Sequence, residues 1–116
     1  MHEYPVVREI ISQAMASLPP GVRLKSLRVA IGEASGISRA CVEHYFPTAA
    51  AGTPAEGASL EFAEEKLAAR CRPCQLEFKS EPGQLRCPAC GSTQLQIVSG
   101  QEVKLLGFET CAPPSP

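Results

Sequence analysis

The segment CRPCQLEFKSEPGQLRCPACGS, which runs from Cys71 to Ser92, decides how the chain around it must fold. It holds two Cys-x-x-Cys pairs separated by 12 residues, formed by Cys71, Cys74, Cys87 and Cys90. Two residues between cysteines let the backbone form a tight knuckle that aims both sulfurs at one point. Two such knuckles supply four thiolates to a tetrahedral ion at about 2.3 Å. The spacing therefore predicts a metal site made of these four side chains.

Zinc is the ion that this spacing favours. Four thiolates fill a tetrahedral coordination sphere and leave no position for water, so the predicted site is structural rather than hydrolytic. In a lobe this small, metal binding supplies most of the folding free energy. Iron in a rubredoxin-like site, two redox disulfides and unligated thiols remain as alternatives. The spacing says little about function, because such ribbons occur in nucleic-acid binders, enzymes and adaptors alike.

The residues before the cysteines predict two helices and two strands. Apolar residues recur at helical spacing in residues 5–18, and Pro19-Pro20-Gly21 ends that helix. Apolar and polar side chains alternate in residues 23–32 and again in residues 58–67, which predicts strands. Between them, Ser38 is a candidate N-cap for a second helix that Gly52 ends.

The residues after the first knuckle predict short β-like pieces and one longer strand. Residues 75–79, 84–86 and 95–98 are the short pieces, and residues 103–109 form the last strand. Its apolar residues need a hydrophobic partner that a small cysteine module does not offer. We therefore expect the last strand to return to the sheet of the first half, which makes the cysteine module an inserted lobe.

The predicted fold class is α+β, with two helices on a three-stranded sheet and an inserted zinc-ribbon lobe. We expect a discontinuous α+β domain over residues 1–66 and 101–111, a zinc-binding ribbon domain over residues 67–100, and a disordered, proline-rich tail over residues 112–116.

Composition argues against several classes of protein. The 116 residues carry 11 basic and 12 acidic side chains, and this balance argues against a nucleic-acid binder. The six Phe and Tyr residues are too few for base-stacking platforms. No apolar run approaches the roughly 20 residues that cross a bilayer, and Glu3 and Arg8 interrupt any signal-peptide core. A cytoplasmic location follows as the expectation, and its reducing conditions favour ligand or free cysteines over disulfides.

The amino terminus, Met1-His2-Glu3, is a second candidate metal site. The α-amine of Met1, the adjacent amide nitrogens and the imidazole of His2 lie within one short stretch of chain. Planar nitrogen donors of this kind suit Ni(II) or Cu(II) and suit zinc poorly. Taken alone, the motif is too short to be distinguished from a solvated histidine.

Several segments together resemble the HypA/HybF family. They are MHE at the start, VAIGEASGIS (residues 29–38), AGTPAEGASLEF (51–62), CRPC…CPACGS (71–92) and LQIVSGQEVKLLGFE (95–109). Their order and spacing resemble that family from residue 1 to about residue 109. Members are nickel chaperones for the maturation of [NiFe] hydrogenases and, in some organisms, of urease.

The resemblance implies an α+β nickel lobe into which the zinc lobe is inserted. It implies that Ni(II) is bound by His2 with backbone nitrogens of Met1 to Glu3, and that structural Zn(II) is held by the four knuckle cysteines. It also implies a HypB-type GTPase and the [NiFe]-hydrogenase large-subunit precursor as partners. We expect no membrane or nucleic-acid partner, and a monomer or weak homodimer.

Some residues depart from the family pattern. Tyr4-Pro5 follows MHE where members usually continue with leucine and small polar residues. His44 is open to two interpretations, an auxiliary nickel ligand or, as we favour, a partly buried packing residue. Cys41 and Cys111 lie outside the knuckles and are expected to be unligated thiols.

Two other functions compete with a nickel chaperone. A structural zinc-ribbon module that binds protein or nucleic acid is the alternative. An enzyme is not expected, because the chain has only two histidines and no Ser/His/Asp or Cys/His constellation.

Overall fold

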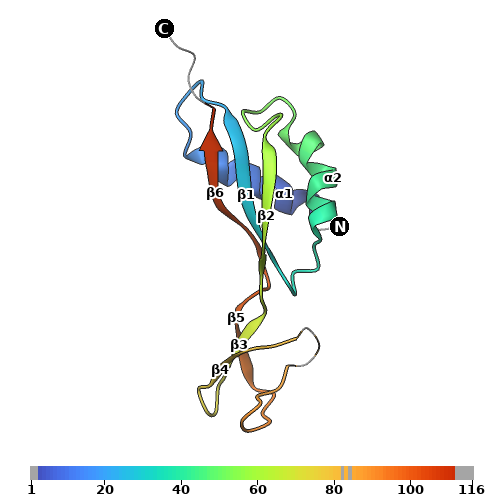
Figure 1. Cartoon of the computed structure of the whole chain (residues 1–116), viewed down its shortest axis with the longest axis vertical. Coiled ribbons are helices and arrows are strands. Elements are labelled where there is room, and N and C mark those ends of the chain that lie inside the picture. The colour runs from blue at the N-terminus through green and yellow to red at the C-terminus, as the bar shows by residue number, and fades with distance from the viewer. Residues whose placement is uncertain (1–2, 82, 84, 112–116) are drawn as a thin grey trace.

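The computed structural model of the chain describes residues 3–81, 83 and 85–111. The molecule is elongated, with two helices against one sheet at one end and a second, smaller sheet at the other (Figure 1). The elements are α1 (Glu3–Ala16), β1 (Leu24–Gly32), α2 (Arg39–Ala50), β2 (Ser59–Glu65), β3 (Ala68–Cys71), β4 (Glu77–Lys79), β5 (Leu95–Ser99) and β6 (Val103–Thr110). None of the helices in the described residues is long and apolar enough to span a bilayer.

The larger sheet has the strand order β2-β1-β6. Strand β1 pairs in parallel with β2, the connection between them being α2, and antiparallel with β6. Leu27, in the middle of β1, lies between Leu60 of β2 and Phe108 of β6. The prediction that the last strand returns to the sheet of the first half is confirmed.

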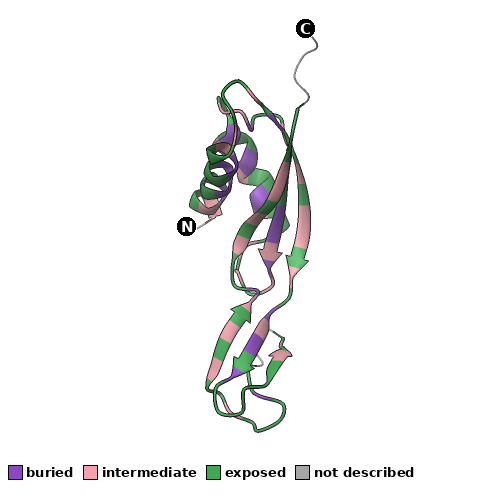
Figure 2. Cartoon of the chain, turned by 90° about the vertical axis from the view of Figure 1, so that its left-hand side faces the viewer, coloured by how far each residue is buried: buried purple, intermediate pink, exposed green. Residues whose placement is uncertain are grey.

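Both helices cover the same face of this sheet and leave its other face open to solvent (Figure 2). Helix α1 buries one stripe with helical spacing, and that stripe packs on the sheet together with side chains of α2. Leu27 and Val29 of β1 are fully buried beneath the helices. Burial of a side chain of this size stabilises the fold by about 1.5–3 kcal/mol. The core residues are Val7, Ile10, Ile11, Ala14, Leu24, Leu27, Val29, Val42, Phe46, Ala50 and Ala55.

Helix α2 begins where the sequence predicts it. Ser38 has an extended backbone, and its hydroxyl accepts a hydrogen bond from the amide of Cys41 at 3.1 Å. An N-cap of this kind satisfies one of the amides that the first turn leaves without a helical partner.

The smaller sheet has the strand order β4-β3-β5, with antiparallel pairs. Strand β3 is central, and it was not predicted from the sequence because its four residues carry no clear alternation. The strand predicted over residues 84–86 is wrong for Leu85 and Arg86, which lie in a loop; residue 84 lies outside the described residues.

The two sheets meet where backbones pack against each other without side chains between them. A Cβ on Gly32 would lie 2.5 Å from the carbonyl oxygen of Gly100, and a Cβ on Gly100 would lie 2.5 Å from the Cα of Leu67. The carboxylate of Glu33 accepts a hydrogen bond from the amide of Leu67 at 2.9 Å. Leu67 is fully buried at this junction. The glycines and Glu33 therefore hold the strands of the two sheets close together.

Candidate metal centre

Four cysteines converge in the smaller lobe. The sulfurs of Cys71, Cys74, Cys87 and Cys90 all lie within 4.8 Å of one another. Cys71 is the last residue of β3, Cys74 lies in the turn that follows, and the other two lie in the loop before β5. Two of the sulfur–sulfur distances, Cys71 to Cys90 and Cys74 to Cys87, are 3.5 Å. The structure thus brings together all four cysteines that the spacing singled out.

The two knuckles have the same backbone geometry. In the first, the amide of Gln75 donates to the carbonyl of Cys71 at 2.8 Å; in the second, the amide of Gly91 donates to the carbonyl of Cys87 at 2.9 Å. Gln75 has φ 65° and Gly91 has φ 75°, both in the left-handed region. The first knuckle is therefore as regular as the second, although its sequence, with Gln75 in place of glycine, led us to expect otherwise.

A side-chain contact compensates for Gln75 in that conformation. Its amide nitrogen Nε2 donates to the carbonyl of Arg72 at 2.8 Å. Among the described residues, Gln75 is the one non-glycine residue with positive φ. A residue other than glycine in this region costs about 1 kcal/mol, and it persists where the surrounding structure requires it.

The pKa values of Cys87 and Cys71 are shifted in opposite directions. Burial opposes ionisation of Cys87, but the backbone amides of Cys90 and Ala89 and the nearby thiols outweigh it and lower the pKa of Cys87 to about 6. The backbone amide of Cys74 favours the thiolate of Cys71, but burial and the surrounding thiols outweigh it and raise the pKa of Cys71 to about 12. A thiolate at one sulfur thus opposes ionisation of its neighbour, and a cation between them removes that opposition.

This cluster fits structural zinc. A tetrahedral site with Zn–S distances of about 2.3 Å needs sulfurs about 3.8 Å apart, close to the spacing found here. The alternation of two buried cysteines, Cys71 and Cys87, with two exposed ones places the centre at the surface of the lobe. Four thiolates leave no open coordination position, so the chemistry that zinc supplies here is cross-linking.

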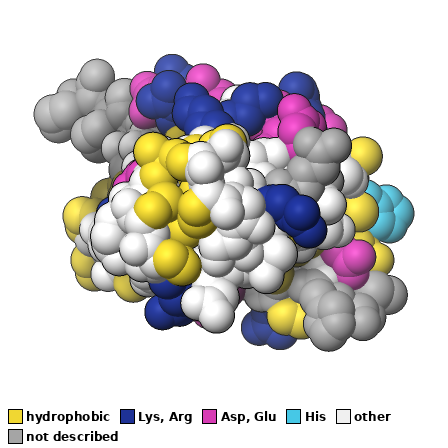
Figure 3. Space-filling model, turned by 90° about the horizontal axis from the view of Figure 1, so that it is seen from below, with side chains coloured by type: hydrophobic (Ala, Val, Ile, Leu, Met, Phe, Trp, Pro, Cys, Tyr) yellow, Lys and Arg dark blue, Asp and Glu magenta, His cyan; other side chains and the backbone are white. Residues whose placement is uncertain are grey.

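The end of the molecule that carries the cluster also presents apolar side chains to solvent. Figure 3 views the molecule from this end and shows hydrophobic side chains, a class that there includes cysteine and proline, gathered beside one another, with charged side chains along one edge of the group. Leu76 and Leu85 are 39% and 42% exposed.

The proposed nickel donors Met1 and His2 lie outside the described residues, and Glu3 is the first residue of α1. Directly after it, the ring of Tyr4 meets the ring of Tyr45 on α2 edge-on, with centroids 5.9 Å apart. The ring of His44 also meets the ring of Tyr45 edge-on, with centroids 4.9 Å apart. His44 is exposed, so the interpretation of it as a partly buried residue is wrong.

The remaining two cysteines lie away from the cluster. Cys41 is half-buried in the first turn of α2, and Cys111 follows β6 and is exposed.

Comparison with known proteins decides the family. The family model described as "Hydrogenase/urease nickel incorporation, metallochaperone, hypA" matches residues 1–110. The chain belongs to the HypA family. The hydrogenase maturation factor HypA of Nitrosospira multiformis is 34% identical over 111 residues, which span 94% of this chain and 96% of that protein. HypA of Aquifex aeolicus is also 34% identical over 111 residues, with the same coverage.

Solved HypA structures have the same fold. A solution structure of the Ni metallochaperone HypA from Helicobacter pylori matches with a TM-score of 0.77 and 26% identity, covering 97% of this chain and all of that one. A second HypA solution structure matches with a TM-score of 0.73 and 28% identity, covering 97% of this chain and 98% of that one. The α+β fold class and the resemblance to HypA are confirmed.

Proposed function

We propose that this chain is a nickel metallochaperone that binds Ni(II) at its amino terminus and delivers it during maturation of [NiFe] hydrogenase. The observation that carries the proposal is the family match, which begins at residue 1 and so includes the MHE motif. The competing function, a structural zinc-ribbon module, accounts for the four cysteines but not for the match to HypA along the whole chain.

The proposed nickel ligands are the α-amine of Met1, the imidazole of His2 and the backbone nitrogens up to Glu3. These donors are consecutive along the chain, so they form a planar set without a pocket, and Ni(II) prefers such geometry. The edge contact between Tyr4 and Tyr45 supports this assignment, because it fixes the start of α1 directly behind the donors. A site at a chain end is open on its outer side, and an acceptor can displace its donors one at a time.

The proposed zinc ligands are Cys71, Cys74, Cys87 and Cys90, and we assign them a structural role. In keeping with this division, we propose that residues 1–66 and 101–111 form the nickel domain and residues 67–100 the zinc domain. The two three-stranded sheets support the division, since each is built from strands of one of these segments.

The proposed partners are a HypB-type GTPase and the large-subunit precursor of the hydrogenase, and we propose the cytoplasm as the compartment in which they meet. Urease is a second candidate client, since the family description names it. The chain would carry and release an ion and would catalyse no bond chemistry.

Replacement of His2 by alanine tests the nickel assignment. We expect His2→Ala to abolish nickel binding in calorimetry and to leave the zinc content unchanged, because the variant removes one donor of a set that zinc does not use. An extension ahead of Met1 should have the same effect, since it converts the α-amine to an amide.

His44→Ala is the matched control for this experiment. His44 is exposed and packs against Tyr45, so its loss should leave the nickel stoichiometry unchanged. Wild-type nickel affinity in His2→Ala would overturn the assignment.

A further inference from the structure

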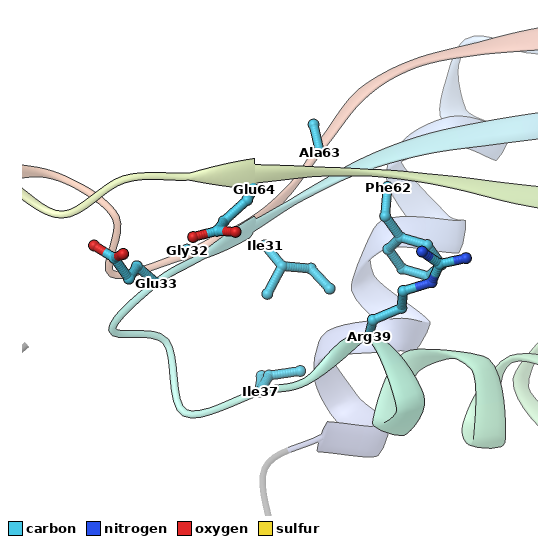
Figure 4. A pocket seen from close by; sticks show the side chains of 8 residues that line it. All are labelled: Ile31, Gly32, Glu33, Ile37, Arg39, Phe62, Ala63 and Glu64. Carbon is cyan, nitrogen blue, oxygen red and sulfur yellow. The ribbon is translucent and has the colours of Figure 1, made fainter.

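A pocket of about 460 Å³ lies between the larger sheet and the start of α2 (Figure 4). Its apolar lining is made by Ile31 of β1, Phe62 of β2 and Ile37 of the loop between β1 and α2. These three side chains are half-buried and pack on the hydrophobic core beneath them. The pocket is therefore preformed, with a volume in the range of small ligand sites.

The position of the pocket follows from the topology of the sheet. Strands β1 and β2 are parallel, and the pocket lies at the carboxyl ends of both, where Gly32 and Glu64 line it. In open sheets with parallel strands, ligands bind in the crevice outside the carboxyl ends of the strands.

The charged residues that line the pocket are Glu33 and Glu64, which both contact Lys66, and Arg39 on the opposite side. The carboxylate of Glu33 accepts a hydrogen bond from the amide of Leu67 and lies 3.6 Å from the ammonium of Lys66. The same ammonium lies 3.1 Å from the carboxylate of Glu64. Both acids of the pocket thus share a cation. One ammonium balances only one of these two carboxylates, so this side of the pocket keeps a net negative charge and directs an incoming carboxylate to the other side.

Arg39 is the cation on the opposite side. Its guanidinium lies over the ring of Phe62, 5.0 Å from the ring centroid, and its side chain is 68% exposed. Its one ion pair among the described residues is a long contact with Glu43, 3.7 Å from Nε to Oε1. The two terminal nitrogens of the guanidinium remain available for a carboxylate, which binds arginine through two parallel hydrogen bonds.

Helix α2 connects this pocket to the start of α1. Arg39 is its first residue, and Tyr45, six residues later, contacts Tyr4. Six helical residues span about 9 Å. A polypeptide that occupies the pocket would therefore lie close to the first turn of α1.

We infer that this pocket docks a partner polypeptide, which inserts one apolar side chain over Ile31, Ile37 and Phe62 and places a neighbouring carboxylate on Arg39. The docking itself is independent of nickel. That the partner belongs to the nickel-delivery machinery rests on the proposed function.

Two synthetic peptides test the docking directly. Acetyl-Ala-Leu-Glu-Ala-amide carries the predicted combination, and acetyl-Ala-Leu-Lys-Ala-amide replaces the carboxylate with an ammonium. In ¹⁵N-resolved NMR titrations of the zinc-loaded protein, we expect the first peptide to shift the amides of Ile31, Ile37 and Phe62 and to bind about tenfold more tightly than the second.

Variants of Arg39 identify the group that causes the preference. Arg39→Gln should make the two peptides bind about equally, and Arg39→Glu should reverse their order. Lys25→Glu is the matched control, because Lys25 is exposed at the opposite end of β1 and its replacement makes the same change in charge. This control should keep the wild-type preference.

Three results would overturn the docking proposal: amide shifts outside the pocket, a preference for the lysine peptide, or a preference that survives in Arg39→Gln. Each variant is also checked for nickel binding, which should equal that of the wild type. Peptide binding without nickel binding would contradict the proposed function and leave the docking site standing. Nickel binding without peptide binding would contradict the docking site and leave the proposed function standing.

Discussion

At the scale of single residues, two positions with positive φ show how context decides which side chain is required. Gly100 has φ +94° between β5 and β6, and a Cβ there would overlap the backbone of Leu67. Gln75 has φ 65° at the surface, where its side chain finds a hydrogen-bond acceptor. Close backbone approach, and not φ alone, therefore restricts Gly100 to glycine.

Gly100→Ala should destabilise the protein by about 3 kcal/mol or more, since left-handed strain and a backbone clash add. Gly36→Ala is the control. Gly36 has φ +77° but open space around it, so alanine there should cost only about 1 kcal/mol. Urea unfolding of the two variants measures both effects, and equal losses of stability would contradict the proposed role of close packing.

At the scale of elements, the connection of the two sheets depends on Glu65 at the end of β2. Its carboxylate contacts the ammonium of Lys104 on β6 at 3.0 Å and accepts a hydrogen bond from the amide of Gly100 at 3.1 Å. Its side chain is 23% exposed. The hydrogen bond from Lys104, followed by that from Gly100, lowers the pKa of Glu65 below its ordinary value of 4.5. The carboxylate thus joins β2, β6 and the turn between the sheets.

A lowered pKa in the folded state has a defined effect on stability. The contribution of Glu65 is fully present above its ordinary pKa of 4.5 and is lost as the pH falls through its lower folded pKa. We expect the difference in unfolding free energy between the wild type and Glu65→Gln to be largest at neutral pH and to shrink below pH 4.5. Comparing variants at each pH cancels the loss of metal from the cysteines, which affects both proteins.

Glu61→Gln is the control for this pH series. Glu61 is exposed on β2 and makes no ion pair with the described residues. Its replacement should change stability little at any pH. A difference for Glu65→Gln that does not vary with pH would show that the carboxylate charge is not the stabilising feature.

At the scale of the whole molecule, the two sheets differ in how they are stabilised. The larger sheet packs beneath two helices over a continuous apolar core. Among the described residues of the smaller lobe (67–100), few hydrophobic side chains are buried, namely Leu67, Ala69, Cys71 and Cys87, and two of these are metal-ligand candidates. A lobe with so little apolar burial depends on a cross-link.

Removal of zinc should therefore unfold one lobe and spare the other. In Cys87→Ala or Cys90→Ala, we expect elemental analysis to find no zinc and NMR to show collapsed amide dispersion for residues 67–100, while the larger sheet stays folded. Cys41→Ala is the control and should retain zinc, since Cys41 lies outside the cluster. Native dispersion of the smaller lobe without metal would contradict the structural role.

The sequence by itself predicts the parts of this fold that depend on local pattern. Helical spacing predicted α1, Ser38 predicted the start of α2, and the Cys-x-x-Cys pairs predicted the sulfur cluster, because each of these signals lies within a few residues of chain. The unsatisfied apolar face of the last strand was also sufficient to predict its return to the first sheet.

Only the tertiary structure decided the features that depend on residues far apart in sequence. Strand β3 exists because β4 and β5 pair with it, the glycine at position 100 is required because Leu67 crosses beside it, and the pocket forms because β1, β2 and the start of α2 meet. His44 is likewise exposed because α2 turns its other face, with Val42, Phe46 and Ala50, to the core. The physical reason is that periodicity records which face of an element is buried, whereas the neighbour that buries it is set by the packing of the whole chain.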